Sequence, residues 1–479
     1  MNSSLILRII GVMLILFSIS FILPLTISLI YNDGNISTFI FSSLISLFFG
    51  LLLYLPNKNS KNDIRTKEGF LIVVLFWFVL SIFGSVPFMI DKQLSLSFID
   101  ALFESISGWT TTGATVLTNI DVLSPSILIY RQELQWLGGM GLVILALAIL
   151  PMLGVGGMHL YKAEATGPIK DKKISPRIAE TAKNLWSIYF GLTIFCAIAY
   201  FLAGMSLFDS VAHSFSTIAI GGFSTHNESI GYFNSYIIEL ICIFFMLLSA
   251  MNFILHFMMI KSKDPMTYFK DSEFRSYLWL IFLLFIILLS FVIIADYNIS
   301  ARDIMFQSIS FITTSGFTSS QYDQWPSFIL SSLIMVSFIG ACAGSAGGGI
   351  KVIRILLLFK LLKKELLKIL HPTAEIPIRV NGVALEDDIS TTLYNFFIFY
   401  ILSYLFLSFM LLASGLDMTT SFSAVASCIN NLGPALGAVS DNYSNINSFA
   451  KYILSFAMIL GRLEIFTLLI IMTPYFWKF

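Results

Sequence analysis

Apolar positions along the chain fall into long stretches separated by short polar segments. Ten stretches are long enough to cross a lipid bilayer, which takes about 20 apolar residues in a helix. They cover residues 5–31, 37–55, 69–90, 127–152, 184–205, 235–260, 276–296, 327–361, 390–414 and 447–475. Four shorter apolar segments, 98–110, 207–219, 301–313 and 418–430, cannot cross and predict re-entrant half-helices. The pattern predicts an all-α polytopic membrane protein.

The order of long and short segments repeats along the chain. Two leading spans are followed by four units, each made of a span, a half-helix, a loop and a second span. We expect the units to be 1–68 (two leading transmembrane helices), 69–183, 184–275, 276–389 and 390–479 (pore repeats 1 to 4). Such helix–pore loop–helix repeats predict a pseudo-fourfold arrangement.

Composition and charge agree with a membrane location and set an orientation. The chain is 57% hydrophobic and 12% charged, whereas soluble proteins carry about 25% charged residues. The net charge is zero, so nothing points to nucleic acid. All Lys and Arg except Lys92, Arg131, Arg302, Lys451 and Arg462 lie in 1–8, 56–68, 153–183, 261–275, 351–389 and the C-terminus. The positive-inside rule then predicts that both termini are cytoplasmic and that the half-helices enter from outside.

A serine followed six residues later by a glycine closes each predicted half-helix. The four copies are Ser107 to Gly113, Ser216 to Gly222, Ser310 to Gly316 and Ser427 to Gly433. Glycine lets the backbone adopt conformations closed to other residues, and successive carbonyl groups can replace the water shell of an ion. A single copy could be an ordinary turn between membrane helices, but four aligned copies favour four walls around one ion pathway.

Aligned helix caps strengthen this interpretation. Sixteen residues before each glycine stand Ser97, Ser206, Ser300 and Asp417, which are favourable N-cap residues. In three copies an aspartate follows three residues later, as in a variant of the capping box. Each half-helix therefore points its C-terminus, the negative end of its dipole, at the glycine loop. The alignment predicts a cation filter.

The motifs also resemble a known family. Segments 103–115 (FESISGWTTTGAT), 216–226 (STIAIGGFSTH), 461–467 (GRLEIFT) and 175–183 (SPRIAETAK) are similar to TrkH-type proteins of the Trk/Ktr/HKT superfamily of potassium uptake systems. The similarity covers essentially the whole chain, and the two leading helices favour the TrkH type over the shorter KtrB type. It implies K⁺ uptake across the bacterial cytoplasmic membrane, a homodimer, and a cytosolic TrkA-type ring of nucleotide-binding regulatory subunits.

The resemblance also assigns a selectivity filter. It implies that K⁺ is the transported ion and the only metal bound. The residues implied to bind it are Thr111, Thr112, Gly113, Ile220, Gly221, Gly222, Thr314, Ser315, Gly316, Asn431, Leu432 and Gly433. In the family a serine at the first glycine is associated with sodium permeation, so glycine at all four positions favours potassium. Two departures are Ile220, where the family often has threonine, and the fourth loop, 430–434, with its asparagines and proline.

The eighth predicted span contains five glycines in the ten residues 340–349. Such a segment makes a poor helix, and irregular backbone at membrane depth is tolerated only where it lines a cavity or is buried in protein. We interpret Gly344, Ser345, Ala346, Gly347, Gly348 and Gly349 as a flexible intramembrane gate below the filter, as the resemblance also implies. The alternative is close helix packing through small residues.

Three further features carry charge or a titratable group. Arg462 lies within a span, where an arginine is costly, and is either an electrostatic barrier below the filter or a structural partner of a carboxylate or of carbonyl groups. The basic cluster 351–368 suits anionic lipid or a docked regulatory subunit. His213, inside the second half-helix, is better explained as a hydrogen-bonding residue behind the filter than as a metal ligand.

Other function classes are less well supported. No His-x-x-x-His pair, Gly-x-Ser-x-Gly motif or Walker loop is present, so we expect no catalytic residues, no enzyme activity and no cofactor held by this chain. A Na⁺-permeable or Na⁺/H⁺-coupled K⁺ symporter of the same superfamily is the alternative. Passive and ion-coupled transport both stay open.

Overall fold

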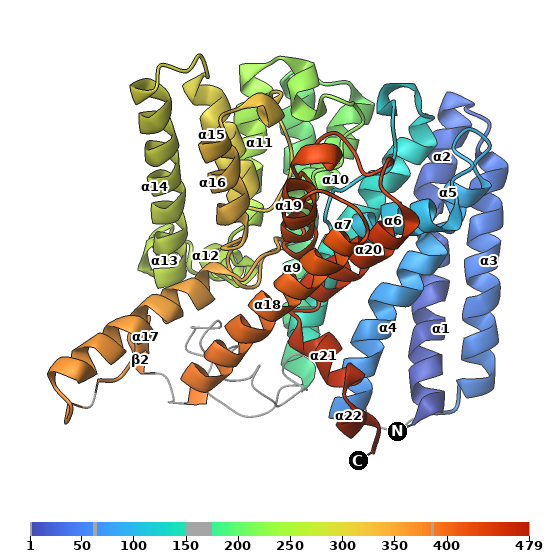
Figure 1. The fold of residues 1–479 in the computed structure, drawn as a ribbon. Helices are drawn as coiled ribbons and strands as arrows, with labels where there is room; N and C mark the ends of the chain where they lie inside the picture. Colours follow the sequence, from blue (N-terminus) through green and yellow to red (C-terminus); the bar gives the residue numbers. More distant parts are fainter. Residues whose placement is uncertain (1, 61–64, 149–174, 375, 385–387, 479) are drawn as a thin grey trace.

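The computed structural model describes residues 2–60, 65–148, 175–374, 376–384 and 388–478, and they form a bundle of helices (Figure 1). The leading region contains α1 (Ser3–Ser20), α2 (Ile22–Tyr31), α3 (Ile36–Tyr54) and η1 (Leu55–Asn57). The first repeat contains α4 (Thr66–Gly84), α5 (Val86–Ile90), α6 (Phe98–Trp109), η2 (Ile120–Val122) and α7 (Pro125–Ala148). The second contains α9 (Ser175–Leu202), α10 (Leu207–Ala219), η4 (Ser229–Phe233), α11 (Tyr236–Ser249), α12 (Phe253–Ser262) and α13 (Met266–Lys270).

The third repeat contains α14 (Ser272–Ile294), α15 (Ala301–Ile312), η5 (Tyr322–Gln324), α16 (Ser327–Ser337), α17 (Val352–Leu370) and the strands β1 (Arg379–Val380) and β2 (Val383–Ala384). The fourth contains α18 (Asp388–Ala413), α19 (Met418–Ile429), η6 (Gly437–Val439), α20 (Ser448–Arg462), α21 (Phe466–Met472) and α22 (Pro474–Lys478). The two strands pair antiparallel, with Val380 opposite Val383.

The predicted membrane spans are present as helices. Six helical stretches in the described residues are long and apolar enough to cross a bilayer, and two sharply bent helix pairs bring the total to eight. The other two predicted spans correspond to α7, which carries the polar run 131–135, and to the pair α16 and α17. The end of span 127–152 and the segment 149–174 lie outside the described residues.

The four half-helices are confirmed, since α6, α10, α15 and α19 match the predicted short segments to within one residue at either end. Each begins at the predicted cap: the side chains of Ser97, Ser206, Ser300 and Asp417 accept the backbone N–H three residues on. In the first three, the serine hydroxyl also donates to the aspartate at that position, at 2.6–2.7 Å. We call the face on which these helices begin the cap face. The chain ends lie at the opposite end of the molecule (Figure 1).

The repeats close into a ring. The span that follows one glycine loop packs against the half-helix of the next repeat: α7 on α10, α11 on α15, and α16 on α19. The last contact, α20 on α6, returns to the first repeat. This order is the pseudo-fourfold arrangement that the sequence predicts, whereas the limits of the repeats at 68, 183, 275 and 389 stay predictions.

Among the described residues, three predicted spans are broken by a sharp bend or by a long irregular segment. The stretch 235–260 bends by 91° between α11 and α12, and 447–475 bends by 115° between α20 and α21. The stretch 327–361 divides into α16 and α17, with residues 338–351 between them outside regular helix. Long-range hydrogen bonds join backbone groups of the break between α11 and α12 to the segment between α16 and α17, and such partners are the condition for breaking a helix at membrane depth. For example, the N–H of Cys342 donates to Ala250 O at 3.0 Å.

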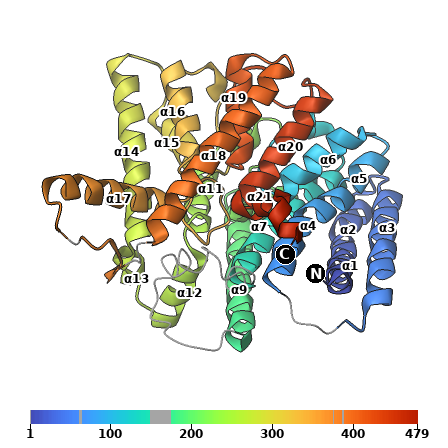
Figure 2. The same ribbon diagram turned by 60° about the horizontal axis from the view of Figure 1, so that its bottom comes forward.

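Helix α17 extends sideways from the body, as both ribbon views show (Figures 1 and 2). It carries the basic cluster of the sequence together with exposed apolar side chains such as Phe359, Leu366 and Ile369. Its first turn is buried, with Val352, Ile353 and Arg354 packed into the body.

Candidate functional site

The four half-helices end in the same way. The residue two before each glycine has a left-handed backbone, with φ of 52° at Thr111, 55° at Ile220, 60° at Thr314 and 53° at Asn431. The N–H of the next residue donates to the carbonyl of the repeated serine at 2.8–2.9 Å, as Thr112 does to Ser107. This is a Schellman motif. The repeated serine therefore contributes a backbone acceptor that ends the helix, six residues before the glycine.

The left-handed positions are unusual for their residue types. Glycine or asparagine ordinarily occupies such a helix end, because a left-handed conformation costs other residues about 1–2 kcal/mol. Only Asn431 fits that preference, while Thr111, Ile220 and Thr314 are β-branched. Strain held at three equivalent positions indicates that surrounding contacts fix the loop geometry.

The four glycines form a closed ring of loops. A Cβ atom added to Gly113 would lie 2.2 Å from Gly221 O, and one added to Gly222 would lie 2.2 Å from Ser315 O. One added to Gly316 would lie 2.1 Å from Leu432 O, and one added to Gly433 would lie 2.5 Å from Thr112 O. Each glycine thus abuts the carbonyl that precedes the next glycine, and the fourth returns to the first. Only glycine fits at this closeness, and the structure brings the predicted filter loops together.

We call the loop around each glycine one wall of the ring, numbered by its repeat. A buried ion pair supports the first wall. The Glu104 carboxylate accepts Nε of Arg131 at 2.8 Å, and both side chains are fully buried. Glu104 also accepts the hydroxyl of Thr115 and the N–H of Val116, just beyond Gly113. Arg131 donates onward to Ser224 O, at 3.2 Å, in the second loop. The pair thereby joins the first two walls.

The second wall is held by side chains of two repeats. Gln135 of α7 donates from its amide nitrogen to Gly221 O at 2.6 Å and accepts the N–H of Phe223 at 3.1 Å. His213 lies 2.9 Å from Ser224 Oγ through Nε2 and 2.9 Å from Asp209 O through Nδ1. His213 is therefore a hydrogen-bonding residue behind the loop, as the sequence suggests.

The divergent fourth loop uses its asparagines as cross-links. Asn431 donates to Thr112 Oγ1 of the first loop at 3.0 Å and to Met458 O at 2.9 Å. Asn430 donates to Ser337 Oγ at the end of α16, at 2.9 Å. Tyr443 donates its hydroxyl to Gly433 O at 2.8 Å. The asymmetry of the sequence therefore reflects contacts by which the fourth wall closes the ring.

The glycine-rich segment 338–351 lies directly against the third and fourth walls. The N–H of Gly348 donates to Thr314 Oγ1 at 2.7 Å. A Cβ atom on Gly348 would lie 2.0 Å from Asn430 O, so this position also needs glycine. The segment folds back on itself, with the N–H groups of Ile350 and Lys351 bonded to Phe338 O and Ile339 O at 2.9 Å. Of the predicted gate residues 344–349, residues 345–348 are buried under the ring, Gly349 is half-buried and Gly344 is exposed, and none of them is in a helix.

Arg462 ends α20 beside this segment and is 3% exposed. Its Nη1 donates to Ala346 O at 3.0 Å, and its guanidinium lies 5.7 Å from the centre of the Trp77 ring. Its sequence neighbour Glu464 instead pairs with Arg354, at 2.5 Å. The sequence leaves open whether Arg462 pairs with a carbonyl group or with a carboxylate. The structure shows the carbonyl of Ala346 as its partner, while the carboxylate of Glu464 pairs with Arg354.

Two supporting residues are not singled out in the sequence analysis. Gln135 belongs to a polar run, residues 131–135, inside an otherwise apolar span, and that run is a signal that could have revealed it. Glu273, at the start of α14, accepts the N–H groups of Ala343 and Ile353 at 2.7 and 3.1 Å and so holds both ends of the gate segment. Its place in a polar helix terminus gives no comparable signal.

Comparison with known proteins agrees with this architecture. A family model described as a cation transport protein, TrkH, matches residues 35–477. The chain is 48% identical over 481 residues to the Trk system potassium uptake protein TrkH of Halomonas elongata, with 100% of both chains covered. It is 49% identical over 479 residues to the protein of the same name in Vibrio parahaemolyticus, with 99% of both covered. It matches the crystal structure of the potassium transporter TrkH from Vibrio parahaemolyticus with a TM-score of 0.93, at 46% identity and full coverage of both chains.

Proposed function

The chain belongs to the TrkH family of cation transport proteins, and from that premise we propose that it takes up K⁺ through a central pore whose selectivity filter is the ring of four glycine loops. The ion is the substrate and is bound at Thr111, Thr112 and Gly113 and at the equivalent positions of the other three loops. Transport runs across the bacterial cytoplasmic membrane, with both termini in the cytosol and the cap face outside.

The observation that carries this proposal is the mutual closeness of the four glycines and the carbonyls of the neighbouring loops. Four half-helices also point the negative ends of their dipoles at this ring, which favours a cation. Backbone carbonyls that replace a hydration shell suit a weakly hydrated monovalent cation. Glycine at all four positions favours potassium over sodium.

Gly222→Ala tests the filter, with Gly191→Ala as the matched control. The added methyl group at Gly222 would lie 2.2 Å from Ser315 O, whereas nothing lies within 4 Å of the same position at Gly191. In liposomes we expect Gly222→Ala to lose most Rb⁺ influx or its preference over Na⁺, and Gly191→Ala to behave as the wild type. Complementation of a K⁺-uptake-deficient bacterium at low external K⁺ tests the function as a whole. Equal Na⁺ and Rb⁺ influx through the wild type would contradict potassium selectivity.

The segment 344–349 is proposed as the gate. It lies against the third and fourth walls, is tied to the third by the hydrogen bond between Gly348 and Thr314, and packs closely against Asn430 O of the fourth. Arg462 would add a positive barrier at the same level. Shortening the segment should raise Rb⁺ influx in protein that still unfolds cooperatively on heating. Unchanged influx in such a protein would show that the segment packs helices and does not gate.

Regulation and assembly complete the proposal. A TrkA-type nucleotide-binding ring in the cytosol would open the gate, and the transporter would act as a homodimer in the bilayer. Light scattering on purified protein tests the dimer, and influx with and without the added partner tests the regulation. If an imposed proton or sodium gradient drives Rb⁺ accumulation, the alternative of a Na⁺/H⁺-coupled symporter is correct.

A further inference from the structure

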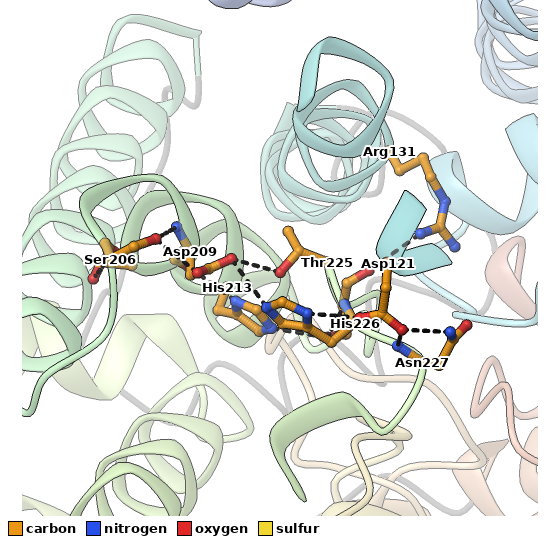
Figure 3. A network of polar contacts seen from close by, with 10 residues as sticks. Asp121, Arg131, Ser206, Asp209, His213, Thr225, His226 and Asn227 are labelled. Atoms are coloured by element: carbon orange, nitrogen blue, oxygen red, sulfur yellow. Dashed lines mark hydrogen bonds and ion pairs between the residues drawn. The ribbon is translucent and has the colours of Figure 1, made fainter. Parts of the chain in front are cut away.

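A histidine on the cap face lies between carboxylates of two repeats (Figure 3). His226 belongs to the loop that follows the second filter glycine. Its Nδ1 lies 2.8 Å from Asp121 Oδ1 in η2 of the first repeat, and its Nε2 lies 3.5 Å from Asp209 Oδ1 in α10. A neutral imidazole can donate from only one nitrogen, whereas an imidazolium donates from both. The two carboxylates therefore suit the protonated ring.

Contacts on every side fix this arrangement. The Tyr232 ring stacks on His226 with centroids 3.5 Å apart and planes at 8°, which favours a cationic ring. Asn227 Oδ1 accepts the N–H of Ile120 at 2.9 Å, next to Asp121. Thr225 donates its hydroxyl to Asp209 at 2.7 Å. The histidine side chain is 15% exposed, so protons can reach it, yet it is not free to turn away.

The same cluster continues toward the filter. The N–H of His226 donates to Ser224 Oγ at 3.0 Å, and Ser224 Oγ lies 2.9 Å from His213 Nε2. Ser224 O accepts Arg131, the residue that joins the first two walls. Only Phe223, whose N–H is held by Gln135, separates Ser224 from Gly222. A change at His226 therefore has a short covalent and hydrogen-bonded route to the second wall.

We propose that His226 is a proton-binding site on the cap face, and that its imidazolium ties the outer loop of the first repeat to the filter loop of the second. The function that follows is tuning of transport by the pH on that side of the membrane. This step rests on the proposed transport function for its flux readout, although the proton site itself does not.

The charges around the imidazole of His226 fix the direction in which its pKa is shifted. Burial lowers the pKa of His226, but hydrogen bonds and charges from Asp209 and Asp121 outweigh burial and leave that pKa raised. The pKa of Asp121 is lowered, since contacts with His226 and Asp121's hydrogen bonds to Asn227 outweigh its own desolvation. The other titratable groups near the His226 imidazole are His213, Tyr232 and the exposed Glu228. The ring centroids of His213 and His226 lie 6.4 Å apart.

The sign of the pH effect follows from the raised pKa. A group whose pKa is raised on folding contributes stability that is complete below its unfolded pKa and is lost as pH rises through its folded pKa. The tie is therefore formed below the ordinary pKa of histidine and is released as the pH rises through the raised pKa of His226. We expect Rb⁺ influx to fall several-fold as the pH at the cap face rises through this range, because the second wall loses a support.

The experiment compares the wild type with His226→Gln and His226→Lys. The control is His371→Gln, which replaces an exposed histidine just after α17. Thermal unfolding of purified protein across pH is the transport-independent readout. The stability difference between wild type and His226→Gln should be largest at low pH and vanish at high pH. His226→Lys keeps a charge and should flatten the pH profile of both Tm and Rb⁺ influx, and His371→Gln should reproduce the wild type.

Asp121→Asn supplies a second variant. It removes one carboxylate charge beside His226. The pH-dependent changes in Tm and in Rb⁺ influx should therefore both move to lower pH. If wild type, His226→Gln and Asp121→Asn share one pH profile in both readouts, the proton site is ruled out. If Rb⁺ influx is absent in every protein while the Tm difference follows pH as described, the proton site stands and the transport function fails. A His226→Gln protein that does not fold leaves the decision to the His226→Lys and Asp121→Asn profiles.

Discussion

Gly348 donates its backbone N–H to Oγ1 of Thr314 at 2.7 Å, and this bond joins the glycine-rich segment to the third wall of the filter ring. Both groups are fully buried. Movement of the segment away from the ring must break this bond, so the two parts cannot change independently.

Thr314→Val removes the acceptor and leaves the shape of the side chain nearly unchanged. An unsatisfied buried N–H costs about 1–3 kcal/mol, which shifts a two-state equilibrium about 5- to 150-fold. On the proposed gating, we expect higher Rb⁺ influx without the proposed regulatory partner, because this bond holds the segment where it would close the pore. Thr313→Val is the control, since the Thr313 hydroxyl donates within its own helix, to Ile309 O at 2.7 Å. Equal influx through both variants would contradict coupling through Thr314.

The buried pair of Glu104 and Arg131 predicts strong non-additivity. Removal of one partner leaves an unpaired buried charge, which typically costs about 3–5 kcal/mol, whereas replacement of both can be nearly neutral. We expect Glu104→Gln and Arg131→Met each to lower the Tm markedly, and the double variant to lower it by less than the sum. Thermal unfolding of the four proteins forms a double-mutant cycle. Additive effects would show that the pair does not act as a unit.

Local signals predicted the half-helices and the glycine-rich break between α16 and α17, but not the other two breaks. The caps and the serine–glycine spacing act within about 16 residues, and they gave α6, α10, α15 and α19 to within a residue. The breaks at 250–252 and 463–465 contain no glycine or proline. Distant segments contact both of them, the first through the N–H of Cys342 and the second through the side chain of Arg354. Glu464 shows the limit of sequence proximity: φ values of 52° and 61° at Glu464 and Ile465 turn the chain, and the carboxylate reaches Arg354 instead of Arg462.

Local patterns also do not show which loop a supporting residue contacts: the polar run 131–135 marks Gln135 as unusual, but not its partner in the next repeat. Gln135 contacts Gly221, which lies 86 residues away in sequence, and the contact depends on the packing of α7 against α10. The ring itself was predictable as a set of loops, but its closure through carbonyls of neighbouring loops depends on the tertiary structure.

Gln135→Met should damage the proposed filter, and Gln307→Met should not. Both glutamines are fully buried, but Gln135 bonds to two backbone groups of the second loop, while the Gln307 amide has no hydrogen-bond partner among the described residues. Loss of both bonds from Gln135 should weaken the preference for Rb⁺ over Na⁺ and lower the Tm. Gln307→Met removes an unsatisfied polar group, so its Tm should equal or exceed that of the wild type. Equal loss of selectivity in both variants would refute a specific role for Gln135.

Arg462→Gln separates charge from hydrogen bonding below the ring. A glutamine amide can still donate to Ala346 O, which Arg462 Nη1 now reaches at 3.0 Å, but it carries no positive charge. Because a buried cation repels K⁺ more strongly where the dielectric is low, we expect Arg462→Gln to raise Rb⁺ influx and Arg462→Lys to stay near the wild type. Arg302→Gln, which removes a 36% exposed charge from the cap face, is the control for a general charge effect. If the Gln and Lys variants conduct equally and both unfold at lower temperature, Arg462 stabilises the break between α20 and α21 and is not a barrier.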